Sequence, residues 1–551
     1  MIKLSMKTVS SLEKCFWDEA LESKREKRAF VMFRNERLSF QVVYRAEDDS
    51  RDISRWCPVT VSGPLAEYAS VRMVGNILNM YPTYNVPFEG ELLRREPGAY
   101  PDLLRPLPYE GCISLPNGQT LALWVDIELP EGFAAGEYDF SLSVRKSGET
   151  LGEVSCRITV LSAVLPKQTL IHTEWFHADS LANYYHTKAF SERHFRYIEA
   201  FLKTAVKNGI NMILTPIFTP ALDTRVGGER MTTQLVDISL DENGRYHFNF
   251  DKLDRFVTLA LSLGVEYFEI PHLFTQWGAK AAPKIVVKVG SRRKKLFGWH
   301  TPATSPEYAD FLSQFLPALV AYFKSRGIDK RCYYHISDEP SLKAMAHYIA
   351  CKNLVEPYLE GAPIIDAQSS LEFFESGALK KPIPNTRSAM KYIDAGVGNL
   401  WVYHCGGGNA GVADRSVSMP LRRTRILGVQ LYLYRIEGFL HWGYNFYNTC
   451  HSRMALDPYQ SPDCAYFTPT GDSFLVYPGT DGEAWESLRL NALREGLDDM
   501  RALMLYESKF GREATEALIL SLAGGKLTFT EYPTSDEFLI TLREAIAKAF
   551  R

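Results

Sequence analysis

The chain has 551 residues, of which 46% are hydrophobic and 23% are charged, and its formal net charge is −3. This length predicts more than one domain, and the balanced charge gives no reason to expect a nucleic-acid partner. The sequence has neither a run of about 20 apolar residues nor a signal-peptide stretch near its start, so we expect no membrane partner and a cytoplasmic location. The nine cysteines are scattered without C-x-x-C spacing, which favours free thiols over disulfides or a zinc site.

Residues 1–163 have the pattern of an all-β region. Polar and apolar residues alternate over 37–44 and 121–129, the period of strands with one buried face. Segments 136–144 and 153–160 alternate in the same way on either side of a short polar turn, which predicts a hairpin. Short strands separated by Gly and Pro turns predict an antiparallel β-sandwich domain over 1–163, ending just before Leu165-Pro166-Lys167.

Residues 164–551 change to a repeated order of strand, loop and helix. Strands are predicted at 170–176, 211–216, 267–272, 332–336, 363–367, 400–405, 438–442 and 474–478. Helices are predicted at 192–208, 253–263, 306–326, 342–358, 421–434, 483–509 and 536–551. A doubly wound open sheet has the same alternation. Eight strands and no G-x-G-x-x-G after the first strand favour a (β/α)8 TIM-like barrel with C-terminal helices, so the fold class is multidomain α and β.

Two neighbouring carboxylates, Asp338 and Glu339, follow the fourth predicted barrel strand. Barrel enzymes keep their chemistry at the carboxyl ends of the strands, so this pair is the predicted catalytic site. Neighbouring Cα atoms are about 3.8 Å apart, so the two side chains are badly placed to face each other across a bond. One would act as the acid, its neighbour would position another group, and the substrate would supply the nucleophile. Alternatively, Ser337 or Asp338 caps the following helix, with Pro340 at its first position.

Aromatic and polar residues gather at the ends of the other predicted strands, as expected of a carbohydrate site. The candidates for substrate binding are Trp175, His272, Gln276, Trp277, His335, Trp401, Tyr403, His404, Trp442, Tyr444 and Asn445. We expect no cofactor and no metal, although His335, His404, His441 and Asp338 could assemble a metal site from separate strands. The basic run 292–295 is predicted to be a solvated loop, with contact to an anionic substrate group as the alternative.

The sequence around the carboxylate pair resembles a known family. The run His335-Ile336-Ser337-Asp338-Glu339-Pro340 is similar to the Asp-Glu signature of glycoside hydrolase family 123, the β-N-acetylgalactosaminidases, and of the related domain of unknown function 4091. The resemblance continues through 438–445, 471–479 and 487–499, and the β-sandwich ahead of the barrel also has the family's layout.

This resemblance implies a retaining hydrolase in which the 2-acetamido group of the substrate is the nucleophile. Glu339 would be the general acid and then the general base, and Asp338 would accept a hydrogen bond from the acetamido N–H. The implied acetamido pocket has Trp401, Tyr403 and Trp442 as candidate walls, and His272, Gln276 and Asn445 as candidate partners of the sugar hydroxyls.

The partner would be an oligosaccharide or glycoconjugate. Two other interpretations remain: a glycosidase of the same barrel type acting on a sugar without a 2-acetamido group, and a non-catalytic carbohydrate-binding protein.

Overall fold

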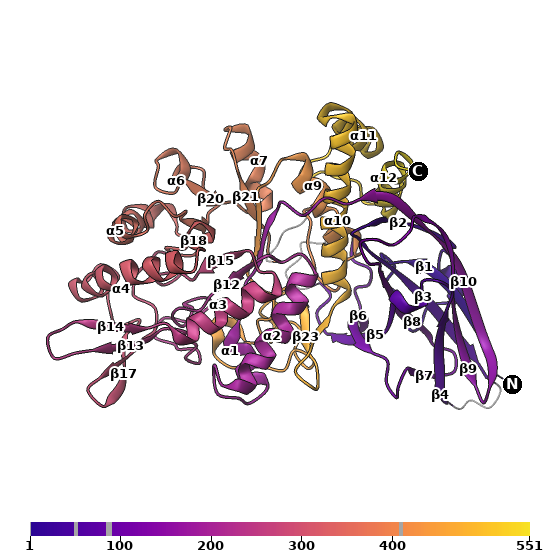
Figure 1. Cartoon of the computed structure of the whole chain (residues 1–551), viewed down its shortest axis with the longest axis horizontal. Helices are drawn as coiled ribbons and strands as arrows, with labels where there is room; N and C mark the ends of the chain where they lie inside the picture. The colour runs from indigo at the N-terminus through magenta and orange to yellow at the C-terminus, as the bar shows by residue number, and fades with distance from the viewer. Residues whose placement is uncertain (1, 49–52, 84–90, 407–410) are drawn as a thin grey trace. The chain divides into compact units, whose positions relative to one another are not determined.

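A computed structural model describes residues 2–48, 53–83, 91–406 and 411–551 (Figure 1). The chain divides into two units. Unit 1 comprises Met1–Gln168, Ala410–Leu433 and Trp485–Arg551, and unit 2 comprises Thr169–Asn409 and Tyr434–Ala484. The units are defined by contacts rather than by sequence pattern, so the domain boundary predicted after residue 163 stays a prediction.

Unit 1 contains two five-stranded sheets that share a hydrophobic core. The first has the order β1-β3-β8-β5-β6, with bounds Lys3–Ser10, Arg37–Glu47, Thr120–Glu128, Ala69–Asn79 and Gly98–Pro106. The second has the order β2-β10-β9-β4-β7, with bounds Ala29–Arg34, Glu149–Val164, Gly136–Lys146, Ser54–Ser62 and Cys112–Leu115. Phe40 and Leu123 of the first sheet and Phe140 and Ile158 of the second belong to one buried cluster. The alternating residues of each strand therefore place their apolar side chains in a common core.

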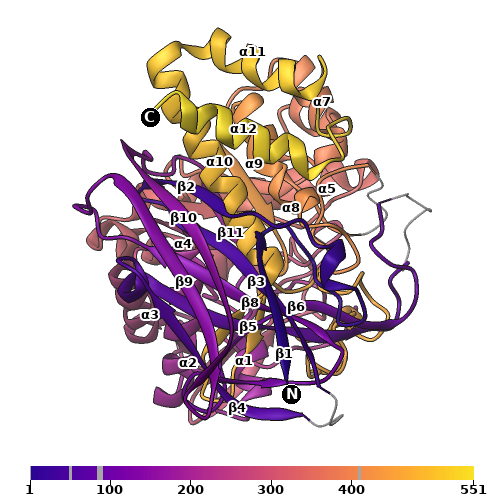
Figure 2. The ribbon, with the colours of Figure 1, turned by 90° about the vertical axis from the view of Figure 1, so that its right-hand side faces the viewer.

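The antiparallel β-rich region predicted from the sequence is confirmed. The predicted hairpin is β9 and β10, which pair antiparallel from Glu149 opposite Lys146 and lie side by side in Figure 2. The pairing has one exception, because β10 also pairs parallel with β2.

Unit 1 also contains helices from residues 410–433 and from the C-terminal segment. They are α8 (Arg422–Arg425), α9 (Leu427–Leu433), α10 (Leu488–Phe510), α11 (Arg512–Ala523) and α12 (Asp536–Lys548). The helix predicted at 483–509 begins instead at α10, where the Ser487 side chain accepts a hydrogen bond from the Leu490 N–H. A Cβ on Gly428 would lie 1.7 Å from the Gly496 carbonyl oxygen, so α9 and α10 approach closely because both positions are glycine.

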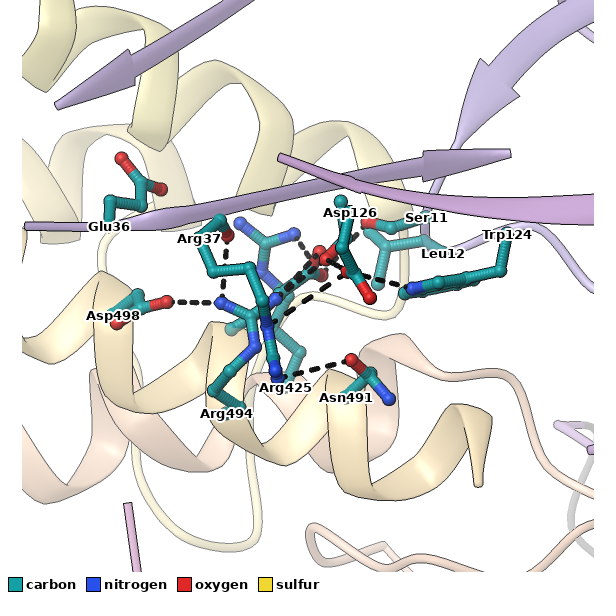
Figure 3. A network of polar contacts seen from close by, with 12 residues as sticks. Ser11, Leu12, Glu36, Arg37, Trp124, Asp126, Arg425, Asn491, Arg494 and Asp498 are labelled. Carbon is teal, nitrogen blue, oxygen red and sulfur yellow. Dashed lines mark hydrogen bonds and ion pairs between the residues drawn. The ribbon is translucent and has the colours of Figure 1, made fainter. Parts of the chain in front are cut away.

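A buried set of ion pairs, the unit 1 ion network, connects the first sheet with helix α10 (Figure 3). Its members are Arg37, Arg72, Asp126, Arg425, Glu486, Arg494, Glu495, Asp498 and Asp499. Arg72 Nη2 lies 2.5 Å from Asp126 Oδ2, and Arg494 Nη1 lies 2.5 Å from Asp498 Oδ2. Arg494 Nη2 also donates to the Ser39 hydroxyl at 2.9 Å. These charges are removed from water but remain paired.

Unit 2 is built on a parallel six-stranded sheet with the order β18-β15-β12-β11-β22-β21. The bounds in this order are Cys332–Tyr334, Tyr267–Ile270, Met212–Leu214, Ile171–Glu174, Gly438–His441 and Trp401–Tyr403. A further parallel pair, β19 (Ile365–Ala367) and β20 (Lys381–Ile383), is joined to β18 and to β21 by the single bridges Tyr334↔Ile364 and Asn385↔Tyr403. Regular pairing therefore covers part of a ring, and a complete (β/α)8 barrel stays a prediction.

Seven of the eight predicted barrel strands lie in these two sheets, and one does not. The segment predicted at 474–478 forms β23 (Val476–Pro478), which lies outside the six-stranded sheet. The prediction was wrong there because β20 (Lys381–Ile383) was missed. Three residues with a central proline give too little strand pattern to recognise.

Helices of unit 2 follow the strands. They are α1 (Ala178–Tyr184), α2 (Glu192–Lys207), α3 (Asp251–Leu263), α4 (Pro306–Ser325), α5 (Met345–Val355), α6 (Glu372–Glu375) and α7 (Thr386–Asp394). In Figure 1, α3, α4 and α5 lie on the outer side of β12, β15 and β18. The amphipathic helix α2 buries its apolar residues, such as Phe201, while Ser191 caps its first turn. In the part of the chain described, no helix is long and apolar enough to cross a membrane.

A small four-stranded sheet extends unit 2 beyond the parallel strands. Its order is β14-β13-β16-β17, with bounds Tyr246–Asn249, Asp237–Leu240, Ile285–Val289 and Arg292–Phe297. The basic run 292–295 lies in β17, so the predicted loop is corrected to a strand that pairs antiparallel with β16. Its side chains are exposed, and Arg293 pairs with Asp237 at 3.0 Å.

Candidate active site

A cavity of about 190 Å³ lies at the carboxyl ends of the parallel strands of unit 2. Asp338 and Glu339, in the loop after β18, both line it. Its other lining residues come mainly from the ends of the neighbouring strands: Trp175, His177, Leu222, Asp223, Gln276, Trp277, Ala367, Tyr403, Cys405, Leu440, Trp442, Phe446 and Phe467. The lining therefore combines aromatic rings with the carboxylates of Asp223, Asp338 and Glu339.

The loop that carries Asp338 and Glu339 is held by hydrogen bonds on both sides of the pair. Before the pair, the Asp366 carboxylate accepts the backbone N–H of Ile336 at 3.1 Å. After it, the Gln368 amide donates to the Pro340 carbonyl at 2.7 Å. Glu339 itself has a φ of 41°, in the left-handed region that residues with a side chain seldom adopt. Strained conformations of this kind persist where the surrounding structure fixes them, and they are common at functional sites.

The helix-cap interpretation of this motif is wrong. The Ser337 hydroxyl donates to the Thr275 carbonyl at 2.9 Å and accepts the Ala279 N–H at 3.1 Å, so it holds the turn after β15. The next helical turn, Leu342–Ala344, follows Ser341 and has no side-chain cap. Asp338 is thus free of a capping role and faces the cavity.

The electrostatics of the pair favour a bound proton. Burial in the site, and then the nearby carboxylates of Glu339 and Asp366, raise the pKa of Asp338 well above its ordinary value. The Tyr403 hydroxyl donates a hydrogen bond to Glu339 Oε1. In the part of the chain that the structure describes, no ion pair joins Asp338 or Glu339 to a basic side chain. Burial and the neighbouring carboxylates therefore favour the protonated form of Asp338.

Five of the predicted substrate-binding residues line the cavity, namely Trp175, Gln276, Trp277, Tyr403 and Trp442. The Trp175 indole N–H donates to Glu269 at 2.7 Å, which fixes the ring as a wall. Trp277 has 47% of its surface exposed and donates its backbone N–H to the Asp338 carbonyl at 2.8 Å. An exposed indole at the mouth of a pocket is available for the apolar face of a sugar ring.

The remaining predicted binding residues lie outside the cavity lining: His272, His335, Trp401, His404, Tyr444 and Asn445. Trp401 is fully buried in the core and donates to Glu437 at 2.8 Å. The Tyr444 hydroxyl donates to the Phe201 carbonyl at 2.8 Å. Asn445 accepts the His177 backbone N–H at 2.8 Å, so it supports a lining residue rather than facing the cavity. His404 packs beside His441, with 5.2 Å between ring centroids.

Several residues of the site were not among the predicted binding residues, although His177 and Asp223 lie near predicted strand ends. His177 lines the cavity, and burial, followed by the nearby Arg230 guanidinium, lowers its pKa to about 3, so the ring is neutral. Asp223 is a third lining carboxylate, and burial raises its pKa. Glu269 and Asp366 lie in β15 and β19 beneath the cavity. The sequence pattern that could have identified Glu269 and Asp366 is a single acidic residue inside an otherwise apolar strand. Such a residue is expected to be buried, and a buried charge needs a partner or a function.

Two groups of possible metal ligands occur among the described residues. The first is His272, His335 and Asp366, and the second is Asp223, Cys450 and His451. Neither is the set His335, His404, His441 and Asp338 considered from the sequence. Both ring nitrogens of His335 already contact carboxylate oxygens, so this ring has no lone pair directed at an ion. The absence of a metal therefore stays an expectation.

Comparisons with known proteins identify the family. The family described as "Glycoside hydrolase 123, catalytic domain" matches residues 175–506. A solved family 123 glycoside hydrolase from Clostridium perfringens is 16% identical and aligns over 100% of this chain and 98% of that chain, with a TM-score of 0.74. No curated protein matches the chain.

More distant solved structures include a Bacteroides ovatus family 5 xyloglucanase, at 9% identity over 90% of this chain and 100% of that chain, with a TM-score of 0.30. A Rhizomucor miehei family 5 mannosidase is 12% identical over 67% of this chain and 97% of that chain, with a TM-score of 0.32. These two carry no weight beside the family match, which covers more than half of the chain. The chain belongs to glycoside hydrolase family 123 and is a glycoside hydrolase with a carbohydrate substrate.

Proposed function

We propose that the protein is a retaining exo-β-N-acetylgalactosaminidase in which the substrate's 2-acetamido group is the nucleophile. The observation that carries this proposal is the neighbouring pair Asp338 and Glu339 in a small, aromatic-walled cavity. A hydrolase that uses two opposed carboxylates needs them on the two sides of the scissile bond. Two neighbouring carboxylates on one loop can instead have different roles. One transfers a proton to the glycosidic oxygen, and the other contacts the acetamido group of the sugar.

The cavity size supports action at the end of a glycan. Its volume of about 190 Å³ is below the range of roughly 300–1,000 Å³ for pockets that enclose drug-sized ligands. It has room for one sugar residue rather than several, so the remainder of the glycan would extend past Trp277. The proposal also treats the parallel sheet, the β19–β20 pair and their two bridging contacts as one irregular eight-stranded barrel.

In the first step, the acetamido carbonyl oxygen bonds to C1 and the bond from C1 to the leaving oxygen breaks. Glu339 gives its proton to that oxygen, and Asp338 accepts a hydrogen bond from the acetamido N–H, which becomes more acidic as positive charge develops. In the second step, the Glu339 carboxylate takes a proton from water, the water oxygen bonds to C1, and the acetamido oxygen leaves. The configuration at C1 is retained because it inverts twice.

The protonation of the free pair fits these roles. Before substrate binds, Asp338 holds a proton, because burial raises its pKa well above the ordinary range. A bound acetamido N–H offers Asp338 a donor and so favours its anionic form, and the proton passes to Glu339. The hydrogen bond from Tyr403 keeps the Glu339 carboxyl directed into the cavity.

A second candidate is a glycosidase acting on a sugar without an acetamido group. The observation that favours it is Asp223, a further carboxylate in the lining that could lie across the scissile bond from Glu339. A panel of 4-nitrophenyl glycosides, with and without 2-acetamido groups and in galacto and gluco forms, separates the two. Turnover confined to acetamido sugars supports the first candidate, and turnover of plain glycosides supports the second.

The sharpest test of the proposed mechanism is Asp338→Asn. Asparagine has nearly the same shape but no charge, so stabilisation of the oxazolinium-like intermediate should fall, and with it the turnover of a 2-acetamido glycoside. A thiazoline analogue of that intermediate should bind the wild type far more tightly than the variant, since such analogues report differential binding. Wild-type turnover together with unchanged thiazoline affinity in the variant would remove Asp338 from the mechanism.

A further inference from the structure

His335, three residues before Asp338 in the chain, is completely buried and close enough to act electrostatically on Asp338. Its ring is held between two acidic side chains from different strands. Nε2 lies 2.6 Å from Glu269 Oε1, and Nδ1 lies 3.0 Å from Asp366 Oδ1. An ionised carboxylate only accepts hydrogen bonds, so both ring nitrogens must carry hydrogen if both acids are ionised.

The surroundings of the two acids supply donors. Glu269 also accepts the Thr173 hydroxyl at 2.5 Å and the Trp175 indole N–H at 2.7 Å. Asp366 also accepts the Tyr348 hydroxyl at 2.7 Å and the backbone N–H groups of Ile336 and Ser337. Burial raises the pKa of Asp366, but the hydrogen bonds donated by Tyr348 and the backbone oppose that rise. Each acid accepts several hydrogen bonds besides that of His335, which favours its ionised form. The ring between them therefore fits the imidazolium form.

We propose that His335 is an imidazolium that acts as a positioning residue for the carboxylate pair. Through Asp366 it fixes the backbone that leads into Asp338, and its positive charge favours the anionic form that Asp338 must adopt when an acetamido group binds. Through Glu269 it also fixes Trp175 in the cavity wall. This assignment rests on the proposed function of the pair and adds a residue that does not touch the substrate.

The other titratable groups around His335 agree with this charge. Burial alone would lower the pKa of His335, but its hydrogen bonds to Asp366 and Glu269 outweigh burial and raise the pKa to about 9. His272 stacks on the ring, with 4.4 Å between centroids. Burial, together with the neighbouring His335 charge, lowers the pKa of His272 far below its usual value, so it stays neutral. Asp338, Glu339 and Asp223 on the cavity side are acids, and Tyr348 is held un-ionised by burial.

Two variants with opposite charge changes test the inference. His335→Gln removes a positive charge close to the pair, so the apparent pKa values of the kcat/KM profile should rise by roughly one pH unit. Glu269→Gln removes a negative charge while His335 stays protonated on Asp366, so they should fall by about as much. A residue with a purely structural role would lower the rate without moving the profile in opposite directions. His247→Gln, at an exposed position of β14, is the control and should leave the profile in place.

Profiles that do not move, or that move in the same direction in both variants, would overturn the proposal. The profile is measured with whichever 4-nitrophenyl glycoside the wild type hydrolyses. A wrong sugar assignment would therefore change the substrate used and not the expected shifts, which keeps the failure of the two proposals distinguishable.

A measurement on the wild type covers the case in which these buried variants fail to fold. In protein labelled with 15N-histidine, a histidine with an ordinary pKa near 6.5 is neutral at pH 8, whereas His335 should carry hydrogen on both ring nitrogens. Tyr348→Phe removes one hydroxyl from Asp366, so the imidazolium signal that shifts in this variant belongs to the ring beside Asp366. The lack of any such responsive imidazolium at pH 8 would refute the inference.

Discussion

Both units of this glycoside hydrolase bury charged side chains, and the unit 1 ion network contrasts with the carboxylate pair of unit 2. In the unit 1 ion network, each guanidinium faces a carboxylate. Arg425 Nε lies 2.7 Å from Asp499, and Arg72 Nη1 lies 2.7 Å from Glu486. In unit 2, by contrast, Asp338 and Glu339 are neighbours of like charge with no basic ion-pair partner in the described part of the chain. The paired charges serve the fold, whereas the uncompensated pair is the arrangement expected where protons are moved.

The imidazolium assigned to His335 lies between these extremes. It is paired on both sides like a structural ion, yet its charge also opposes the burial and the neighbouring carboxylates that raise the pKa of Asp338. The comparison therefore predicts three kinds of outcome on substitution. Substitutions of Asp338 or Glu339 should affect turnover, and substitutions in the unit 1 ion network should affect stability. Substitutions of His335 should affect turnover and stability, and also the pH dependence of each.

The largest effect is expected from Glu339→Gln. Loss of a general acid should lower kcat by about 10² to 10⁴-fold. The thermal midpoint should stay the same or rise, because one of two repelling carboxyl groups is gone. Substrates with very acidic leaving groups need less protonation, so their first step should suffer least. The exposed Glu242→Gln serves as the control, and wild-type turnover by Glu339→Gln would exclude Glu339 as the acid.

A large loss of stability, without loss of kcat, is expected from Arg425→Met. The change removes the 2.8 Å and 2.7 Å contacts of Arg425 with Glu495 and Asp499, and leaves these acids only the 3.8 Å contacts with Arg494 and Arg543. Removing one partner of a buried ion pair typically costs about 3–5 kcal/mol. Denaturant unfolding followed by fluorescence measures the loss, and kcat is taken under conditions where the variant is folded. Arg25→Met is the matched control, because the Arg25–Glu537 pair is exposed and such pairs contribute less than about 1 kcal/mol. Equal losses in the two variants would contradict the distinction between paired buried ions and surface ions.

The features that could be predicted from the sequence are those that depend on local residue patterns. Period-two alternation correctly gives β3, β8, β9 and β10, and helical periodicity gives α2, α3 and α4 within two residues of their observed bounds. The position of Asp338 and Glu339 beside the cavity also follows from local order, because a loop after a parallel strand opens at the carboxyl edge of the sheet.

Contacts between distant segments could not be reached in this way. Periodicity shows that α10 has a buried face but not which sheet it covers, and the Arg494 contact with Ser39 spans 455 residues of sequence. Trp401 and Tyr444 have the aromatic character of sugar-binding residues but lie in the core. A strand residue alternates between the two faces of its sheet, so an error of one position exchanges a cavity residue for a core residue. The same limit hid Glu269 and Asp366, whose role depends on His335.

A smaller effect is expected in the pH dependence of stability. The pKa of His335 is raised from 6.5 to about 9 in the folded state, so the folded protein binds its proton more tightly than the unfolded chain does. This contribution, on the order of 3 kcal/mol, should be fully present below pH 6.5 and should disappear as pH rises through 9. Other groups titrate in the same pH range, notably Lys14, because burial lowers its pKa to about 7.

The difference between wild type and His335→Gln is therefore the quantity to measure. Free energies of unfolding from urea titrations at pH 6, 7.5 and 9.5 should show this difference becoming smaller at each step. A difference that stays constant with pH would mean that His335 is neutral in the folded protein. The assignment of His335 as a paired imidazolium would then be wrong.

The smallest expected effect is that of chelation on activity, which should be none. The proposed chemistry needs only a proton donor, a carboxylate and the substrate's own acetamido oxygen. His335 has both ring nitrogens hydrogen bonded, and Asp223 accepts the Ser452 N–H at 3.2 Å. Each group of possible ligands thus has a member already engaged by the protein. Dialysis against a strong chelator, followed by assay with and without added Zn²⁺, Mn²⁺ or Ca²⁺, measures any dependence. A rate that falls on dialysis and returns with one ion would show that Asp338 and Glu339 act together with a metal. The contrast with the unit 1 ion network would then hold only for the metal-free protein.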